Sequence, residues 1–231
     1  MRIKNLLFLI TFLLILFNVY TILEWDLIES RWVRIISVTI LGGCSARISA
    51  LENRFLLIAF FLFLLCDFFL LWYEIDIAKY FYFGIHSLAY LFILFHIKSE
   101  IKKPKFNLLQ NIYFIAIILI NSYLFYKVAS IFSEEIEELG LEILFYIHGL
   151  ITVAMVMAAF SFWDNRVNRA SIVLFMSILS LALSDVIMFS AYYIELKEMY
   201  YLERGLYVIG LAGLARFSAL YQNEPIKEEN F

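Results

Sequence analysis

Prolines, cysteines and charged residues are scarce in this 231-residue chain. Both prolines, Pro104 and Pro225, lie outside the long apolar runs, so no run carries a proline kink. The two cysteines, Cys44 and Cys66, fall within apolar runs and show no disulfide or CxxC pattern. Only 17% of the residues are charged, whereas 64% are hydrophobic and the mean hydropathy is +0.85. A soluble domain of this size cannot bury so much apolar surface, so the composition excludes one.

The apolar residues are gathered in blocks of about 20, the length at which a helix crosses a ~30 Å hydrocarbon layer. Lipid-spanning strands would alternate apolar and polar residues, whereas these blocks are apolar on nearly every side. We therefore predict an all-α integral membrane protein, a single transmembrane domain over residues 1–231 with a polar tail at 221–231. Its bundle has eight transmembrane helices joined by short loops, over residues 5–23, 31–50, 54–73, 77–97, 107–127, 140–162, 170–193 and 199–220.

Charged residues are unevenly divided between the two sides of this predicted bundle. The side with both termini holds 12 of the 18 lysines and arginines, and the opposite side holds 13 of the 21 acidic residues. The positive-inside rule then places both termini in the cytoplasm, which requires an even number of spans. We expect a multi-pass protein of a bacterial inner (cytoplasmic) membrane, with a basic face on anionic headgroups and no nucleic-acid partner. Nothing in the sequence sets an oligomeric state.

Polar residues interrupt five of the predicted spans at one common depth. In the spans predicted to run outward, Asp67, Asn121 and Asp185 lie 13 to 15 residues after the cytoplasmic start. In the spans predicted to run inward, His86 and His148 lie 9 and 8 residues after the outer start. At 1.5 Å per residue all five fall between mid-bilayer and its outer half. Arg34 and Arg204 enter the same slab from the outer side. This agreement predicts one polar cavity inside the bundle.

Helical spacing supports such a cavity. Tyr82, His86 and Tyr90 recur every four residues and share one face, and a serine stripe that includes Ser184 runs beside Asp185. Intramembrane carboxylates are functional by default, because a bilayer penalises them by about 2.5–3.5 kcal/mol each. A buried structural pair of aspartates remains the alternative. Arg34 and Arg204 either contribute to the site or extend to the headgroups at the outer rim.

Eight spans with these polar positions resemble the YhhN family of membrane lysoplasmalogenases. Three short motifs carry the resemblance, in the third, fourth and seventh predicted spans: Cys66-Asp67, His86 with Tyr90, and Ser184-Asp185. Family members usually have glycine before the first aspartate, and Ala-Gln where this chain has Glu203-Arg204. The resemblance therefore describes a divergent member, and it implies hydrolysis of the vinyl-ether bond of a lysoplasmenyl phospholipid.

That chemistry suits two buried carboxyls. A vinyl ether opens when its β-carbon is protonated, and water then attacks the resulting oxocarbenium ion. Asp67 and Asp185 are therefore predicted to act as general acid and base, with one protonated and the other ionised. The histidines, His86 and His148, would position the water or relay a proton. The predicted substrate contacts are Arg34, Tyr82, Tyr90, Asn121, Ser184 and Arg204, with the arginines at the outer rim on the lipid phosphate. We predict no cofactor and no metal.

Two other classes of function remain open. A metal-dependent lipid hydrolase would use the two aspartates and two histidines as zinc ligands, although no HxxxH or HExxH spacing supports it. A non-enzymatic lipid-binding or proton-coupled membrane protein would use the carboxyls as a proton relay.

Overall fold

The computed structural model describes residues 3–49, 53–98, 115, 139–193 and 196–223, and these residues are almost entirely helical. They form seven helices: α1 (Ile3–Glu24), α2 (Leu27–Ser49), α3 (Arg54–Leu70), α4 (Asp76–Ile97), α6 (Leu139–Arg166), α7 (Arg169–Tyr193) and α8 (Lys197–Asn223). Each coincides with one predicted helix. The eighth, predicted over 107–127, lies outside the described residues except for Ile115, and the predicted site residue Asn121 lies there with it.

Four of the described helices are long and apolar enough to cross a membrane: Asn5–Glu24, Asp76–Ile97, Gly140–Arg166 and Arg169–Tyr193. Helix α3 is 17 residues long, a little short of the usual span, because a turn follows Leu70. Helices α2 and α8 are less apolar since they carry charges such as Arg34 and Glu203, which the structure buries inside the bundle. The chain is a multi-pass helical membrane protein.

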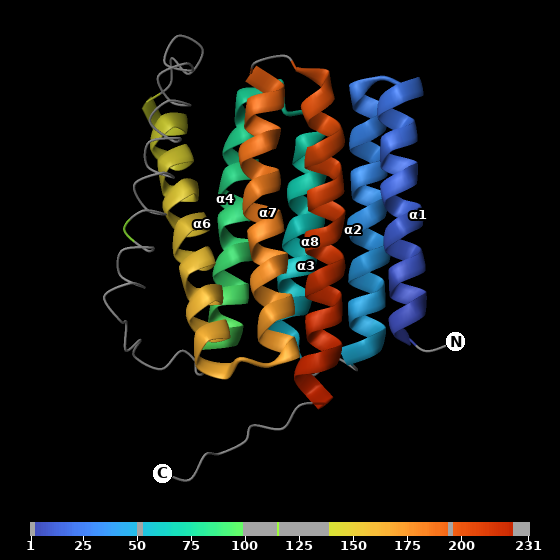
Figure 1. Ribbon diagram of the computed structural model, residues 1–231. Helices are drawn as coiled ribbons and strands as arrows, with labels where there is room; N and C mark the ends of the chain where they lie inside the picture. The colour runs from blue at the N-terminus through green and yellow to red at the C-terminus, as the bar shows by residue number, and fades with distance from the viewer. Residues whose placement is uncertain (1–2, 50–52, 99–114, 116–138, 194–195, 224–231) are drawn as a thin grey trace.

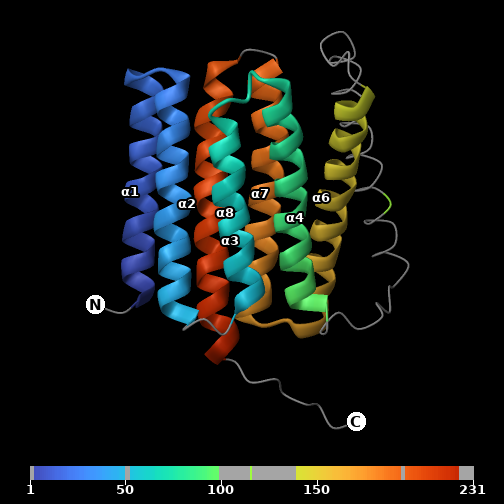
Figure 2. The ribbon, with the colours of Figure 1, turned by 180° about the vertical axis from the view of Figure 1, so that it is seen from behind.

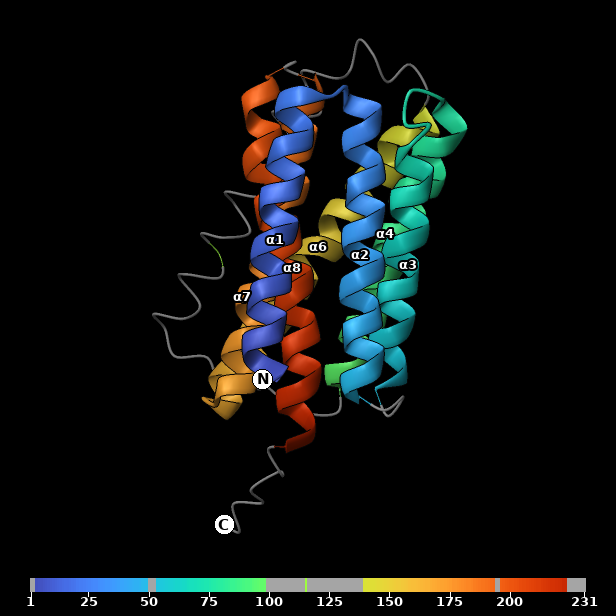
Figure 3. The same cartoon turned by 90° about the vertical axis from the view of Figure 1, so that its right-hand side faces the viewer.

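The helices stand side by side along one axis, with α1 at one edge of the bundle and α6 at the other (Figures 1 and 2). Helix α8 packs against α1, α2 and α7, and α3 packs against α2 and α4. Helix α6 contacts both α4 and α7, which joins the two rows α1–α8–α7 and α2–α3–α4 (Figure 3). The start of α1 and the end of α8 lie at the same end of the bundle (Figure 1). Three helices, α4, α6 and α7, thus meet around one interior region.

The surface of the bundle is apolar, as lipid contact requires. Large side chains such as Phe8 and Leu150 are more than two-thirds exposed, at 74% and 71%. Several charged side chains are buried, among them Arg34, Asp67 and Asp185. A distribution with apolar groups outside and charges inside is the reverse of a soluble domain, and it concentrates the chemistry in the interior.

Small residues bring α7 and α8 together. A Cβ atom added at Gly210 on α8 would lie 2.6 Å from Cγ of Leu181 and 3.1 Å from the backbone oxygen of Ser177, both on α7. A side chain there would force the helices apart, because the second contact is backbone. This close approach sets the position of Ser184 and Asp185 on α7 relative to Glu203 on α8.

Candidate functional site

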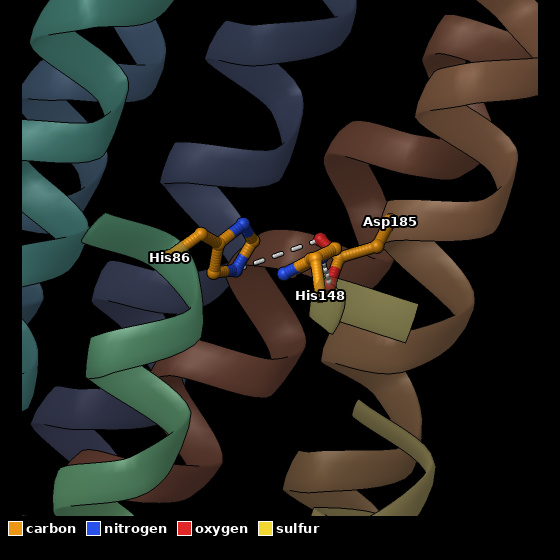
Figure 4. Close-up of side chains that lie close together, drawn as sticks. All are labelled: His86, His148 and Asp185. Carbon is orange, nitrogen blue, oxygen red and sulfur yellow. Dashed lines mark ion pairs between the residues drawn. The ribbon is translucent and has the colours of Figure 1, made fainter. Parts of the chain in front are cut away.

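Asp185 of α7 lies between two imidazoles in the interior. His86 of α4 places Nε2 3.7 Å from Oδ1 of Asp185, and His148 of α6 places Nε2 3.7 Å from Oδ2. Figure 4 shows both rings turned toward the carboxylate. All three side chains are buried. Side chains from three helices, α4, α6 and α7, thus converge on one carboxyl group, which we call the Asp185 centre (His86, His148 and Asp185).

Neighbouring hydroxyls hold two members of the Asp185 centre in place. The hydroxyl of Tyr90 donates a 2.7 Å hydrogen bond to Oδ2 of Asp185. Oγ of Ser87 lies 3.1 Å from Nδ1 of His148, on the side of the ring away from the carboxylate. His86 stacks on Tyr90 with ring centroids 5.0 Å apart, but neither of its nitrogens has a hydrogen-bond partner among the described residues. One imidazole is therefore oriented by a hydrogen bond and the other by ring packing.

Asp67 of α3 has different partners. Nε of Arg34 donates to Oδ1 of Asp67 at 2.6 Å, and the hydroxyl of Tyr207 donates to Oδ2 at 2.7 Å. The guanidinium of Arg34 also lies over the ring of Tyr207, 3.7 Å from its centroid. Both oxygens of Asp67 thus accept a short hydrogen bond, and one of these is charge-assisted, which favours the ionised carboxylate.

Glu203 of α8 completes this second group. Its Oε1 accepts a 2.5 Å hydrogen bond from Nη1 of Arg34, and its Oε2 lies 3.0 Å from Nη1 of Arg204. Oγ of Ser184 donates to the backbone oxygen of Glu203 at 3.2 Å. Two guanidinium groups therefore face two carboxylates, and the charge of this group is balanced. We call it the arginine group (Arg34, Asp67, Glu203 and Arg204).

Tyr82 and Met188 lie between the arginine group and the Asp185 centre. Sδ of Met188 accepts from the Tyr82 hydroxyl at 3.3 Å and lies 3.6 Å from Nη1 of Arg34. The ring of Tyr82 meets the ring of His86 edge-on at 5.5 Å. Among the described residues, no hydrogen bond or ion pair joins Asp67 to Asp185. The two aspartates therefore belong to adjacent clusters with separate partners, rather than to one directly paired set.

A small surface hollow opens beside Met188, near the ends of α3 and α7 and the starts of α2 and α8. Its lining is aromatic and basic: Arg31, Leu70, Tyr73, Met188, Tyr192, Tyr200 and Arg204. Nε of Arg204 has no hydrogen-bond partner among the described residues, although it is buried. Arg31 is engaged, since its guanidinium makes a two-pronged contact with Glu74 at 3.0 and 2.7 Å. Arg204 thus borders the hollow and has one buried donor without a partner among the described residues.

Arg34 and Arg204 turn into the bundle, although the sequence left open whether they contribute to the site or extend to the headgroups. Arg34 is 1% exposed and Arg204 is 2% exposed. The reason is electrostatic: Asp67 and Glu203 compensate both charges inside the bundle, so neither side chain needs to reach the headgroups. Glu203 and Tyr207 were not predicted as site residues. Their spacing of four residues on α8 was the available signal, because it puts them on one helix face.

The predicted residues that the structure describes separate into two sets. The first set forms or supports the Asp185 centre: His86, His148, Asp185 and Tyr90. The second set belongs to the arginine group or contacts it: Arg34, Asp67, Arg204 and Ser184. Tyr82 lies between the two clusters. At the Asp185 centre, the sequence analysis did not predict Ser87, whose hydroxyl contacts Nδ1 of His148. It follows His86 directly and carries no motif of its own.

Fold and site together define a polytopic helical membrane protein with ionisable side chains in its interior. The family model for the YhhN family matches residues 30–217, most of the chain, and the protein belongs to that family. No curated protein matches the chain, and no solved structure does. The matched segment contains both clusters.

Proposed function

We propose that this protein is an intramembrane hydrolase that cleaves the vinyl-ether bond of lysoplasmalogen-type lysophospholipids, giving a fatty aldehyde and a glycerophospho-alcohol. The YhhN family is associated with lysoplasmalogenase activity. The observation that carries the proposal is the Asp185 centre, in which a buried carboxyl has an imidazole nitrogen 3.7 Å from each of its oxygens. Such a group both donates and accepts protons, as this reaction requires.

Charge balance favours a proton at the Asp185 centre. The two clusters contain three carboxyl groups, those of Asp67, Asp185 and Glu203, and two guanidinium groups, those of Arg34 and Arg204. The arginine group is neutral by itself, so the uncompensated negative charge falls on Asp185. An unpaired carboxylate inside a membrane protein is costly, and one proton shared among Asp185 and the two imidazoles removes that cost. This proton is the one available for the reaction.

The shared proton accounts for every step of the hydrolysis. It is transferred to the β-carbon of the vinyl ether, which leaves an oxocarbenium ion next to the negatively charged Asp185 centre. Water then adds to the carbon attached to the ether oxygen, and the centre takes up the proton that the water loses. The resulting hemiacetal breaks into aldehyde and alcohol as a proton moves to the departing oxygen. One water is consumed and the centre returns to its starting state.

Asp67 has a supporting role in this scheme. Its carboxylate is held by Arg34 and Tyr207, so it is poorly suited to give up a proton. We assign it to positioning Arg34, in place of the expected acid–base partnership with Asp185. We assign Arg204, which borders the hollow, to the lipid phosphate, because a guanidinium group suits phosphate oxygens. Met188 and Tyr82 separate that hollow from His86.

The test is aldehyde release from lysoplasmenyl-ethanolamine by purified protein in detergent, without added metal or nucleotide. Asp185→Asn and His148→Gln should each lower turnover by at least ~10²-fold, because neither amide transfers a proton. Matched controls are Asp76→Asn, whose side chain is 64% exposed, and His96→Gln, whose ring lies against Phe217 and Tyr221 away from the site. Both controls should keep wild-type turnover. Folded wild-type protein that binds lysolipid without releasing aldehyde would favour the lipid-binding alternative.

A further inference from the structure

We propose that His86, His148 and Asp185 form a binding site for one divalent transition-metal ion, with zinc as the ion best suited to it. Each residue offers one ligand atom, and the three atoms all lie within 4.8 Å of one another. They come from α4, α6 and α7, so the folded bundle is needed to assemble them. Imidazole nitrogen and carboxylate oxygen are ordinary zinc ligands.

The distances approach those around a bound ion, which would draw the three side chains closer together. Zinc binds histidine nitrogen at about 2.0–2.1 Å and carboxylate oxygen at about 2.0–2.2 Å, which places neighbouring ligands of a tetrahedron roughly 3.3–3.5 Å apart. Nε2 of His86 and Nε2 of His148 each lie 3.7 Å from an oxygen of Asp185. That separation is too long for a hydrogen bond and close to the ligand spacing around zinc. Figure 4 shows the two rings converging on the carboxylate.

His86 supplies an independent observation. Its side chain is 1% exposed, yet neither Nδ1 nor Nε2 has a hydrogen-bond partner among the described residues. Buried polar atoms are nearly always partnered, so a side chain of this kind calls for an explanation. Nε2 points toward Asp185, and a metal ion between them would satisfy it. Packing against Phe63, Tyr82 and Tyr90 holds the ring in that orientation.

The surrounding hydrogen bonds are those that a metal site requires. A ligating histidine usually has its second nitrogen fixed by a hydrogen bond, and a ligating carboxylate is held in the same way. Ser87 contacts Nδ1 of His148, and when Nδ1 carries the proton the lone pair of Nε2 faces Asp185. Tyr90 donates to Asp185. Three protein ligands leave a fourth position for water.

The metal ion and the catalytic proton of the proposed function would occupy the same atoms. Either one compensates the negative charge of Asp185, and both cannot bind together. Zinc is therefore expected to inhibit aldehyde release reversibly, and a chelator to restore it. This consequence rests on the proposed function, whereas metal binding itself depends only on the geometry of the three residues.

Binding is measured on full-length protein purified without a histidine tag, stripped with a chelator and titrated with zinc or cobalt(II). We expect one ion per chain and, for cobalt, the visible absorption of a tetrahedral site. His86→Ala, His148→Ala and Asp185→Asn should each weaken binding by at least ~10²-fold, whereas His96→Ala and Asp76→Asn should not change it. Absence of saturable binding, or binding that all three variants retain, would overturn the proposal.

A further variant distinguishes weaker metal binding from loss of the fold. Ser87→Ala removes only a hydroxyl and should weaken zinc binding by about 10-fold or more while leaving the thermal unfolding midpoint of the zinc-free protein unchanged. Unchanged affinity in this variant would argue against His148 as an oriented ligand. The two proposals fail separately. Aldehyde release without zinc binding would contradict only the metal-site proposal. Zinc binding without aldehyde release would contradict only the hydrolase proposal.

Discussion

Arg34 and Asp67 form an ion pair inside the bundle, with Nε of Arg34 2.6 Å from Oδ1 of Asp67 and both side chains 1% exposed. Arg34 also binds Glu203, so one guanidinium neutralises parts of two carboxylates. Removing one partner of a buried pair leaves a charge uncompensated, which costs far more than the pair contributes when intact. The pair therefore makes folding depend on both residues.

Arg34→Met is expected to lower the free energy of unfolding by about 3–5 kcal/mol, because Asp67 and Glu203 remain buried without their shared cation. The measurement is unfolding of the purified protein in detergent. Arg47→Met is the control, since Arg47 is an exposed arginine near the end of the same helix. Asp67→Asn should cost much less in the Arg34→Met background than in the wild type. Equal costs in both backgrounds would show that the two residues are not coupled.

Gly210→Ala is expected to destabilise the protein by about 1–3 kcal/mol through overpacking of α7 against α8. The added Cβ would meet Leu181 and the backbone of Ser177. Gly43→Ala is the matched control, because a Cβ at Gly43 meets nothing within 4 Å. Alanine favours a helix over glycine by about 0.5–1 kcal/mol, so the control should be neutral or stabilising. Equal effects of the two substitutions would contradict the close approach of α7 and α8.

Glu74, in the turn that follows α3, gives a pH-dependent prediction. Burial is the largest single influence and acts to raise the pKa of Glu74. The hydrogen bond from Arg31, a backbone hydrogen bond and the charges of Arg31 and Lys79 together outweigh it, and the pKa is lowered from 4.5. A lowered pKa stabilises the fold above about pH 4.5, and this contribution is lost as the pH falls through the folded-state pKa. Glu74 is 56% exposed, so the effect should stay below about 1 kcal/mol. Glu74→Gln should be less stable than wild type at pH 7 and equal to it near pH 3. A difference that persists at pH 3 would exclude this ion pair as its cause.

Cysteine labelling tests the orientation of the bundle. Asp26 follows α1 at one end and Val167, 73% exposed, separates α6 from α7 at the other. In a background without Cys44 and Cys66, a membrane-impermeant reagent added outside intact cells should label Asp26→Cys and not Val167→Cys. The positive-inside rule gives this direction. Labelling of Val167→Cys alone would invert the topology, and labelling of both would exclude the spanning arrangement.

The sequence was sufficient for the seven helices that the structure describes, whereas the eighth helix and the membrane depth of the polar residues stay predictions. Blocks of about 20 apolar residues leave the backbone in a membrane only the helix, since every amide must find a partner within its own segment. An aspartate or histidine in such a block is conspicuous without any structure, and counting residues from the helix start gives its depth. Asp67, His86, His148 and Asp185 were found in this way.

The partners of each residue were decided only by the tertiary structure. Helical periodicity gives the face on which a side chain lies, but not which helix packs on that face, because apolar surfaces fit many neighbours equally well. The sequence therefore predicted one cavity for Asp67 and Asp185 but not their partners. In the folded bundle Asp67 contacts Arg34 and Tyr207, and Asp185 lies beside two histidines. For the same reason the sequence left open whether Arg34, near the outer end of its predicted span, contributes to the site or extends to the headgroups. It turns inward because carboxylates from α3 and α8 meet it there, and only the packed bundle brings those helices together.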